Sequence, residues 1–292
     1  MPLTWFGIPA PYCDYGHARA VIIPAPYEGT VSWGKGTANA PAAMLAASPY
    51  IEFYDSILGR ETFKLGIHGR EPLVMPADPW QAALKVKAAV APELETLRRP
   101  VVVGGEHSLS LGAVSACLER WPDLAVLQLD AHADLRDEYG GSRFSHACVM
   151  RRIAELGAKF VQAGVRALSI EERQWLDAER RDFISARAIV RGGGWVESVI
   201  GALSDHVYLT LDLDCLDPSE MPATGTPEPG GISYHHILDL ALALAASGKE
   251  VIGMDMVELA PIPGLFHPDY LAAQLLYTLI GAFWGNDLAT GR

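Results

Sequence analysis

The chain has 292 residues, of which 50% are hydrophobic and 20% are charged, and its formal net charge at pH 7 is −12. This length and composition are typical of a globular protein with one or two domains, and the negative charge disfavours nucleic acids and anionic membranes as partners. The four cysteines, Cys13, Cys117, Cys148 and Cys215, form no CxxC pair, which argues against a zinc knuckle and against a disulfide framework.

The start of the chain, MPLTWFGIPAPY, has no basic region followed by an apolar stretch, so we expect no signal peptide. No uninterrupted apolar run approaches the roughly 18 residues that a membrane-spanning helix needs. We therefore expect a cytoplasmic protein that does not bind membranes.

Short apolar runs rich in valine, isoleucine and leucine alternate along the chain with stretches of helical character. The runs predict strands over residues 20–23, 100–103, 124–129, 159–163, 207–213 and 251–256. The stretches predict helices over residues 80–97, 109–120, 146–156, 196–202 and 235–246. This alternation is typical of a parallel sheet covered on both faces. With no linker-like segment to divide the chain, we predict a single α/β domain over residues 1–292.

Acidic residues and histidines follow four of the predicted strands. In open parallel sheets, ligands bind beyond the carboxyl ends of the strands, so we expect these side chains to lie close together. The residues are Glu106 and His107 after the second strand, Asp130, His132 and Asp134 after the third, Asp212 and Asp214 at the fifth, and Asp255 and Glu258 at the sixth.

Clustered carboxylates of this kind need a counter-charge. In a cleft of low dielectric they repel one another and raise each other's pKa, and divalent cations remove that cost. A single DxH or DxD run is often only a solvated loop or a helix cap, but the joint pattern favours a metal site. Carboxylate and imidazole ligands without a thiolate suit Mn²⁺, and they do not separate it from Co²⁺ or Ni²⁺. Two histidines and four aspartates suit two ions with shared carboxylate bridges.

The same segments resemble the ureohydrolase family, which includes arginases and agmatinases. The matching segments are GGEHS (104–108), DAHAD (130–134), SHA (145–147), LDLDCLDP (211–218), ATGTPEPGG (223–231) and DMVELAP (255–261). The resemblance implies a three-layer α-β-α fold of the arginase–deacetylase type, with a parallel sheet of about eight strands. It implies one Mn²⁺ held by His107, Asp130, Asp134 and Asp212, and a second held by His132, Asp130, Asp212 and Asp214.

The reaction that the resemblance implies is hydrolysis of a guanidino group to urea and an amine, in which hydroxide bridging the two metals attacks the guanidinium carbon. Glu258 matches the carboxylate that pairs with the guanidinium, and His146 matches the histidine that passes protons to the leaving amine. Thr226 matches a position that lines the substrate site. A solvated acid, a helix cap and a structural turn are the respective alternatives. The resemblance also implies a homo-oligomer, either a trimer or a hexamer.

The sequence favours agmatine, with putrescine as the product, over arginine. The segment GGSRFSHA lacks the SGN run of arginases, and Ser169 stands where arginases carry an acid. Glu171 or Glu228 could meet the distal ammonium group of such a small cationic substrate. Arg136 keeps 4-guanidinobutanoate open, and an open pocket mouth would admit N1-aminopropylagmatine.

Two other classes of protein remain as alternatives. One is a single-zinc amidohydrolase of the related deacetylase type, and the other is a non-catalytic metal-binding homologue. Two departures from the family pattern stand beside metal ligands or the proton-transfer histidine. Glu106 replaces a common Asp, which puts in doubt a hydrogen bond to the metal-binding imidazole, and Ala147 replaces a common Gly.

Overall fold

A computed structural model describes residues 4–285 of the chain. Its centre is an eight-stranded sheet in which every strand pairing is parallel, with the strand order β4-β1-β5-β10-β9-β6-β7-β8. The strands are β1 (Ala20–Ala25), β4 (Ile67–Gly69), β5 (Arg99–Gly104), β6 (Ala125–Leu129), β7 (Lys159–Val165), β8 (Ile184–Ser185), β9 (His206–Asp212) and β10 (Glu250–Val257). The predicted α/β class with about eight parallel strands is confirmed.

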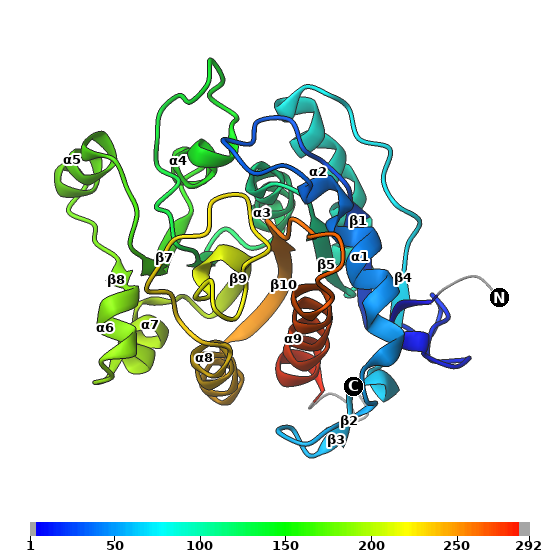
Figure 1. Ribbon diagram of the computed structural model, residues 1–292. Coiled ribbons are helices and arrows are strands. Elements are labelled where there is room, and N and C mark those ends of the chain that lie inside the picture. The colour runs from blue at the N-terminus through cyan, green and yellow to red at the C-terminus, as the bar shows by residue number, and fades with distance from the viewer. Residues whose placement is uncertain (1–3, 286–292) are drawn as a thin grey trace.

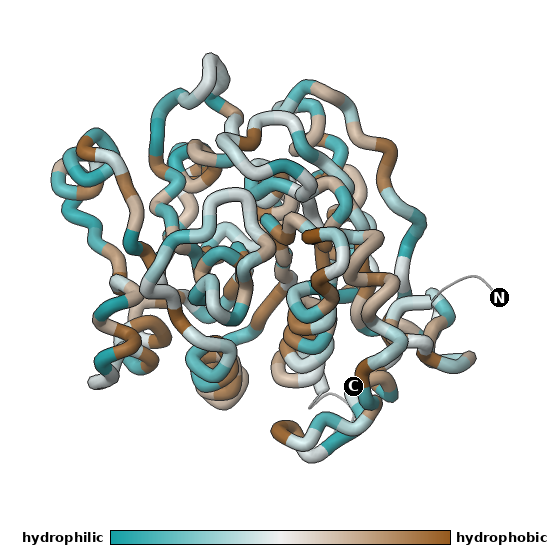
Figure 2. The backbone as a smooth tube through the Cα atoms, viewed as in Figure 1, coloured by the Kyte–Doolittle hydropathy of each residue, from teal (hydrophilic) through white to brown (hydrophobic). Residues whose placement is uncertain are grey.

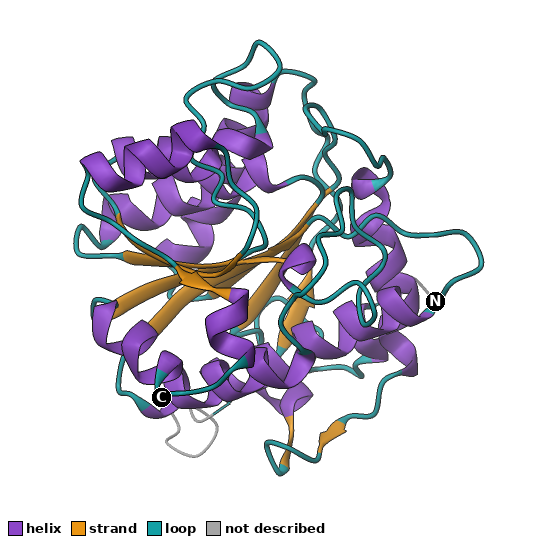
Figure 3. Cartoon of the chain, turned by 60° about the vertical axis from the view of Figure 1, so that its left-hand side comes forward, coloured by secondary structure: helices purple, strands orange, loops and turns teal. Residues whose placement is uncertain are grey.

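Helices cover both faces of this sheet and give the molecule three layers (Figure 1, Figure 3). One face packs against α2 (Pro79–Glu95), α3 (Ser110–Arg120), α4 (Val149–Glu155) and α5 (Ile170–Ala178). The other face packs against α1 (Ala40–Ala47), α6 (Ala186–Val190), α7 (Trp195–Ala202), α8 (Tyr234–Ala246) and α9 (His267–Trp284). A short antiparallel hairpin, β2 (Tyr54–Asp55) and β3 (Arg60–Glu61), lies outside the sheet.

The strand sequences explain why both faces are covered. Successive side chains on a strand point to opposite faces, and in β5 Val101 and Val103 join one apolar core while Val102 joins the other. Most of these helices turn apolar residues toward the cores, and Figure 2 shows both hydrophobic (brown) and hydrophilic (teal) residues on α8. The predicted continuous apolar runs are thus strands that are buried on two sides.

The structure differs from the sequence prediction in several places, and strands β4 and β8 and helices α5 and α6 are among the elements that were not predicted. The predicted helix over 146–156 begins as a short 3-10 turn (His146–Cys148), and the α-helix starts at Val149. Helix α9 was not predicted, and 12 of its 18 residues are buried. A helix that is buried nearly all round has no clear polar stripe, so its periodicity is weak. Among the described residues, no helix is both long and apolar enough to cross a membrane.

The strand order places the polar segments beside one another. Strands β5, β10, β9 and β6 are consecutive neighbours in the sheet, and they are the four strands after which acids or histidines follow. Because all four run parallel, their carboxyl ends meet at one edge of the sheet. This edge forms the floor of the candidate site.

Candidate metal centre and active site

Two groups of side chains meet at this edge. In the first group, the Nδ1 atom of His107 lies 3.1 Å from Asp130 Oδ2, 3.0 Å from Asp134 Oδ2 and 3.4 Å from Asp212 Oδ2. These four residues are the set expected for one ion, and all of them are buried.

In the second group, the Nδ1 atom of His132 lies 2.9 Å from Asp214 Oδ2 and 3.6 Å from Asp130 Oδ1. Asp130 therefore presents one oxygen to each histidine, as a bridging carboxylate would. Asp212 has its Oδ1 atom occupied by the backbone N–H of Asp214 at 2.8 Å, and its Oδ2 atom faces His107. The structure thus places Asp130 between the two groups. Asp212 contacts His107, so it belongs most directly to the first group.

The charges of the first group call for a cation. The His107 Nδ1 atom is buried and has no hydrogen-bond partner among the described residues. Burial disfavours a charged His107, but the carboxylates of Asp130, Asp134 and Asp212 outweigh it and raise the pKa of His107 well above its usual value.

The carboxylates themselves are destabilised as anions. Burial, followed by repulsion from neighbouring carboxylates, raises the pKa of Asp134 to about 7 and that of Asp212 well above its usual value. A single proton on Nδ1 cannot meet three carboxylate oxygens, whereas a divalent cation binds several oxygens and a nitrogen at once. Imidazole nitrogen and carboxylate oxygen are a donor set that suits Mn²⁺, so these residues fit the metal that the sequence implies.

Other side chains hold the metal-facing residues in place. The Nε2 atom of His107 lies 2.8 Å from the hydroxyl of Thr210, which donates to Asp255 at 2.7 Å. Asp130 accepts a hydrogen bond from the amide of Gln128 at 2.6 Å and one from the backbone of His132 at 2.6 Å. Such partners fix the orientation of a ligand and raise its basicity. The imidazole support that the sequence left in doubt at Glu106 is supplied by Thr210.

The backbone around the ligands needs unusual conformations. Asp134 and Glu258 have positive φ angles of 53° and 66°, which are costly for residues other than glycine and gather at functional sites. At Gly105 a Cβ atom would lie 1.8 Å from the carbonyl oxygen of Tyr27. Only glycine therefore lets the turn before His107 pack against the end of β1.

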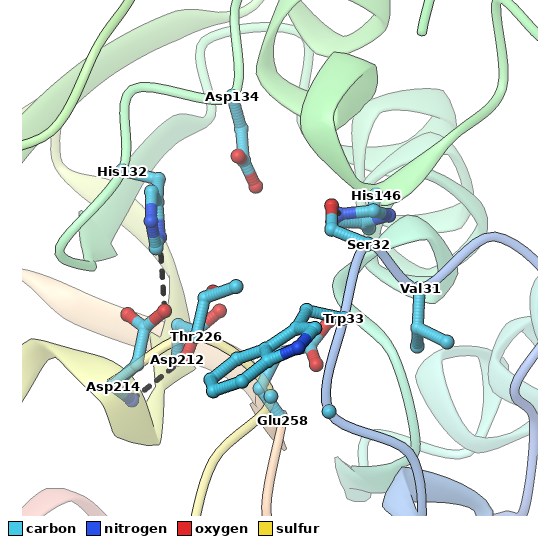
Figure 4. A pocket seen from close by; sticks show the side chains of 12 residues that line it. Val31, Ser32, Trp33, His132, Asp134, His146, Asp212, Asp214, Thr226 and Glu258 are labelled. Carbon is cyan, nitrogen blue, oxygen red and sulfur yellow. Dashed lines mark hydrogen bonds and ion pairs between the residues drawn. The ribbon is translucent and has the colours of Figure 1, made fainter. Parts of the chain in front are cut away.

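The three residues assigned to substrate and proton transfer lie around the same space. Glu258, Thr226 and His146 line a pocket together with four of the metal-facing residues (Figure 4). Glu258 Oε1 accepts the backbone N–H of His107 at 2.7 Å, and burial, with the charge of Glu106, raises the pKa of Glu258 well above its usual value. Burial lowers the pKa of His146. The structure thus brings together all nine residues to which the sequence assigned a metal, substrate or proton-transfer role, and their roles stay predictions.

Sequence reasoning missed several residues at the site. Ser32 and Trp33, from the segment before α1, line the pocket (Figure 4), and the Trp33 side chain is 79% exposed. Arg166, just after β7, donates to the backbone carbonyls of Asp214 at 2.7 Å and Glu228 at 2.8 Å, among five carbonyl contacts. Ser32 and Trp33 lie in the segment GTVSWGKG (29–36), and nothing in the sequence of that segment assigns a role to single residues.

A wider cavity of about 340 Å³ continues outward from this pocket and shares Ser32, His132, Asp134, His146 and Thr226 with it. Glu228 and Arg136, both proposed for the distal end of the substrate, lie in its wall, whereas Glu171 is not among its lining residues. Glu172 also lines the cavity, but its carboxylate already accepts the backbone N–H groups of Leu135 and Ser169. Glu228 is therefore the better candidate for a distal cation.

Comparison with known proteins agrees with this geometry. The family model described as arginase family matches residues 18–281. An N(1)-aminopropylagmatine ureohydrolase from Synechocystis sp. is 37% identical over 282 residues, which covers 94% of this chain and 92% of that protein. An agmatinase from Bacillus cereus is 32% identical over 253 residues, which covers 85% of this chain and 86% of that protein.

Among solved structures, the agmatine ureohydrolase of Thermoplasma volcanium superimposes with a TM-score of 0.88 at 29% identity, covering 97% of this chain and 96% of that one. The family model spans most of the chain, and two relatives exceed 30% identity over most of their length. The chain therefore belongs to the arginase family of ureohydrolases.

Proposed function

We propose that this protein uses two Mn²⁺ ions to hydrolyse the guanidino group of a small cationic guanidinoamine, agmatine or its N1-aminopropyl derivative, to urea and an amine. One observation carries the proposal. Two imidazole nitrogens, on His107 and His132, face buried carboxylates and share Asp130 between them. This arrangement lies at the floor of a pocket whose wall includes Glu258 and His146.

The reaction needs help because a guanidinium carbon is a poor electrophile. A pair of divalent cations, held by the two histidines and the aspartates around them, would supply hydroxide near neutral pH by lowering the pKa of water. Glu258 has Oε1 held by the His107 backbone, which leaves Oε2 available to pair with the guanidinium and orient it. His146 protonates the leaving amine, since an imidazole titrates close enough to neutral pH for proton transfer. Burial lowers the pKa of His146, so its ring is neutral before it takes up that proton.

The pocket gives no support to arginine as substrate. The hydroxyl of Ser169, at the position where arginases carry an acid, accepts the backbone N–H of Glu172 and caps α5. The hydroxyl of Ser169 therefore serves as a helix cap and does not replace the acid of arginases. Agmatine lacks the carboxylate of arginine, and its distal ammonium suits Glu228 in the cavity wall. Arg136, which also lines this wall, is the feature that would instead favour 4-guanidinobutanoate.

N1-aminopropylagmatine is favoured by two observations. The cavity of about 340 Å³ outside the inner pocket has room for a substrate longer than agmatine. The ureohydrolase from Synechocystis sp. named for this compound is 37% identical to the chain, and the agmatinase from Bacillus cereus is 32% identical. The guanidino group of either substrate would occupy the inner pocket, the agmatine chain would extend along the outer cavity toward Glu228, and the aminopropyl group would continue beyond it.

The experiment is urea release from the Mn²⁺-loaded protein with agmatine, N1-aminopropylagmatine, 4-guanidinobutanoate and arginine. We expect both cationic guanidinoamines to be hydrolysed with a kcat/KM far above that of arginine. Equal or faster hydrolysis of arginine would reject the specificity and spare the reaction class. No urea from any compound, with two ions bound, would support a non-catalytic metal-binding homologue.

Glu228→Gln tests how the distal cation is recognised. Because an exposed ion pair is worth about 0.2–1 kcal/mol, we expect kcat/KM for the cationic substrates to fall up to about fivefold, with metal content unchanged. Glu171→Gln is the matched control, because Glu171 is not among the residues that line the cavity. An equal fall in both variants would argue against a direct contact.

The oligomeric state, the cellular location and the product of the enzyme are proposed from its resemblance to the family. We propose a homo-oligomer, a trimer or a hexamer, located in the cytoplasm and supplying putrescine or a longer polyamine. Light scattering coupled to size-exclusion chromatography tests the assembly, and a molar mass equal to one chain of 31.5 kDa would contradict it.

A further inference from the structure

The segment from Glu28 to Gly36, named here the N-terminal loop, holds both ring nitrogens of His146. The hydroxyl of Thr30 lies 3.1 Å from Nδ1, and the hydroxyl of Ser32 lies 3.0 Å from Nε2. Thr30 also accepts the backbone N–H of His146 at 3.0 Å. These contacts join residues that are 114 to 116 positions apart in the sequence.

A buried carboxylate anchors this loop. Glu106 is fully buried, and its Oε2 atom accepts the backbone N–H groups of Gly29 at 2.7 Å and Thr30 at 2.6 Å. Its Oε1 atom accepts the hydroxyls of Thr30 at 2.7 Å and Ser108 at 2.6 Å. A carboxylate has about four acceptor positions, so Glu106 is filled by four donors. The hydroxyl hydrogen of Thr30 is therefore committed to Glu106.

This commitment decides how Thr30 meets the ring of His146. A hydroxyl has one hydrogen to donate and two lone pairs to accept with. The hydrogen goes to Glu106, and one lone pair takes the backbone N–H of His146. Only an acceptor position is left for Nδ1, so Nδ1 must carry a hydrogen. In the neutral ring, Nε2 then has a free lone pair.

The other neighbours of the ring are compatible with this tautomer. Ser32, which faces Nε2, has its hydroxyl free to donate to it, and both side chains lie together at the pocket wall (Figure 4). The hydroxyl of Ser145 lies 3.2 Å from Nδ1. It can donate or accept, so it does not select a tautomer by itself. Glu106, acting through Thr30, does.

We propose that Glu106 and Thr30 are positioning residues that hold neutral His146 with its hydrogen on Nδ1, so that Nε2, facing the pocket, is the atom that exchanges the proton. The inference rests on the proposed function, in which His146 protonates the leaving amine. In each turnover Nε2, with Ser32 beside it, takes up a proton from water and transfers that proton to the nitrogen of the departing amine as its bond to the guanidino carbon breaks. Nδ1 keeps its hydrogen throughout, and the ring returns to the same neutral form.

The first test reads the tautomer directly and needs no substrate. Protein labelled with ¹⁵N at histidine and loaded with diamagnetic Zn²⁺ gives separate NMR signals for protonated and unprotonated ring nitrogens, and His146→Gln assigns the signal. We expect neutral His146 to be protonated at Nδ1 in the wild type, in Thr30→Ser and in Ser145→Ala. In Thr30→Val, we expect a substantial population protonated at Nε2. A wild-type ring protonated at Nε2, or no change in Thr30→Val, would overturn the inference.

The second test separates positioning from general stability. Of the hydrogen bonds that Thr30→Val removes, the one to Nδ1 positions the ring, and one such bond is worth about 0.5–1.5 kcal/mol. We therefore expect kcat to fall by about 2- to 13-fold, with KM and metal content unchanged. Thr30→Ser should restore most of it. Thr37→Val is the control. Thr37 directly follows the N-terminal loop, and among the described contacts its hydroxyl bonds only Glu28. An equal fall in kcat in Thr37→Val would contradict the assignment. The expected tautomer in a protein that releases no urea would uphold the positioning and reject the proposed function.

Discussion

Replacing Thr210 by valine tests how the protein supports the metal-facing histidine. Valine keeps the shape of threonine and removes only the hydroxyl. That hydroxyl lies 2.8 Å from His107 Nε2 and 2.7 Å from Asp255, and all three side chains are buried. The substitution leaves the buried Nε2–H of His107 without its acceptor, while the hydroxyl of Tyr208 remains on Asp255.

Two quantities should change. An unsatisfied buried donor costs about 1–3 kcal/mol of the free energy of unfolding. The group that orients a metal-binding histidine is worth about 10- to 100-fold in metal affinity, which is about 1.4–2.7 kcal/mol. We therefore expect the Kd for Mn²⁺, measured by calorimetry on protein freed of metal, to rise by that factor, together with a lower Tm of the metal-free protein.

Thr278→Val is the matched control. Thr278 is also buried, and its hydroxyl also donates to an aspartate, Asp55, at 2.6 Å. It lies on α9, against the opposite face of the sheet from Thr210 and α3. This variant should lose comparable stability and keep its affinity for Mn²⁺. If Thr210→Val lost stability but bound Mn²⁺ as tightly as Thr278→Val, the account of His107 as a metal ligand held by Thr210 would be refuted.

Three further substitutions separate the proposed roles. Asp130→Ala removes the carboxylate shared by both histidines, so binding of two Mn²⁺ and urea release should both be lost, and two tightly bound ions in elemental analysis would contradict this. His146→Ala should lower kcat by about 10²- to 10⁴-fold with metal content unchanged, whereas loss of metal would make His146 a ligand. Glu258→Gln should lower kcat/KM for agmatine by about 2–5 kcal/mol of transition-state stabilisation, and an unchanged value would exclude its pairing with the guanidinium.

Local sequence patterns predicted the long strands of the sheet and missed the shortest strands and the most buried helix. The strands that carry the site are long apolar runs, and each was located within two residues of its bounds. Strand β8 has two residues and β4 has three, which is too short for an alternation or a run to be recognised. Helix α9 is long, but burial on nearly every side removed the polar stripe that marks a surface helix.

In the candidate site, the metal-facing residues could be predicted from the sequence, whereas the residues that support them could not. The metal-facing residues follow strands, so their proximity could be inferred from the parallel sheet and from the family resemblance. The support of His107 by Thr210, and of His146 by Thr30, joins residues more than 100 positions apart. A hydroxyl in a strand or a loop has no sequence signal for such a partner. The contacts of Arg166 could not be predicted either, because its side chain donates to backbone carbonyls, which every residue type carries.

In the proposed enzyme, His107 and His132, with the aspartates around them, bind a pair of cations. The most direct test of this binding is a crystal structure of the Mn²⁺-loaded protein with anomalous scattering measured at the manganese edge. We expect two peaks, one within bonding distance of His107 Nδ1 and one within bonding distance of His132 Nδ1, with Asp130 contacting both. A single peak, or two peaks that do not share Asp130, would contradict it.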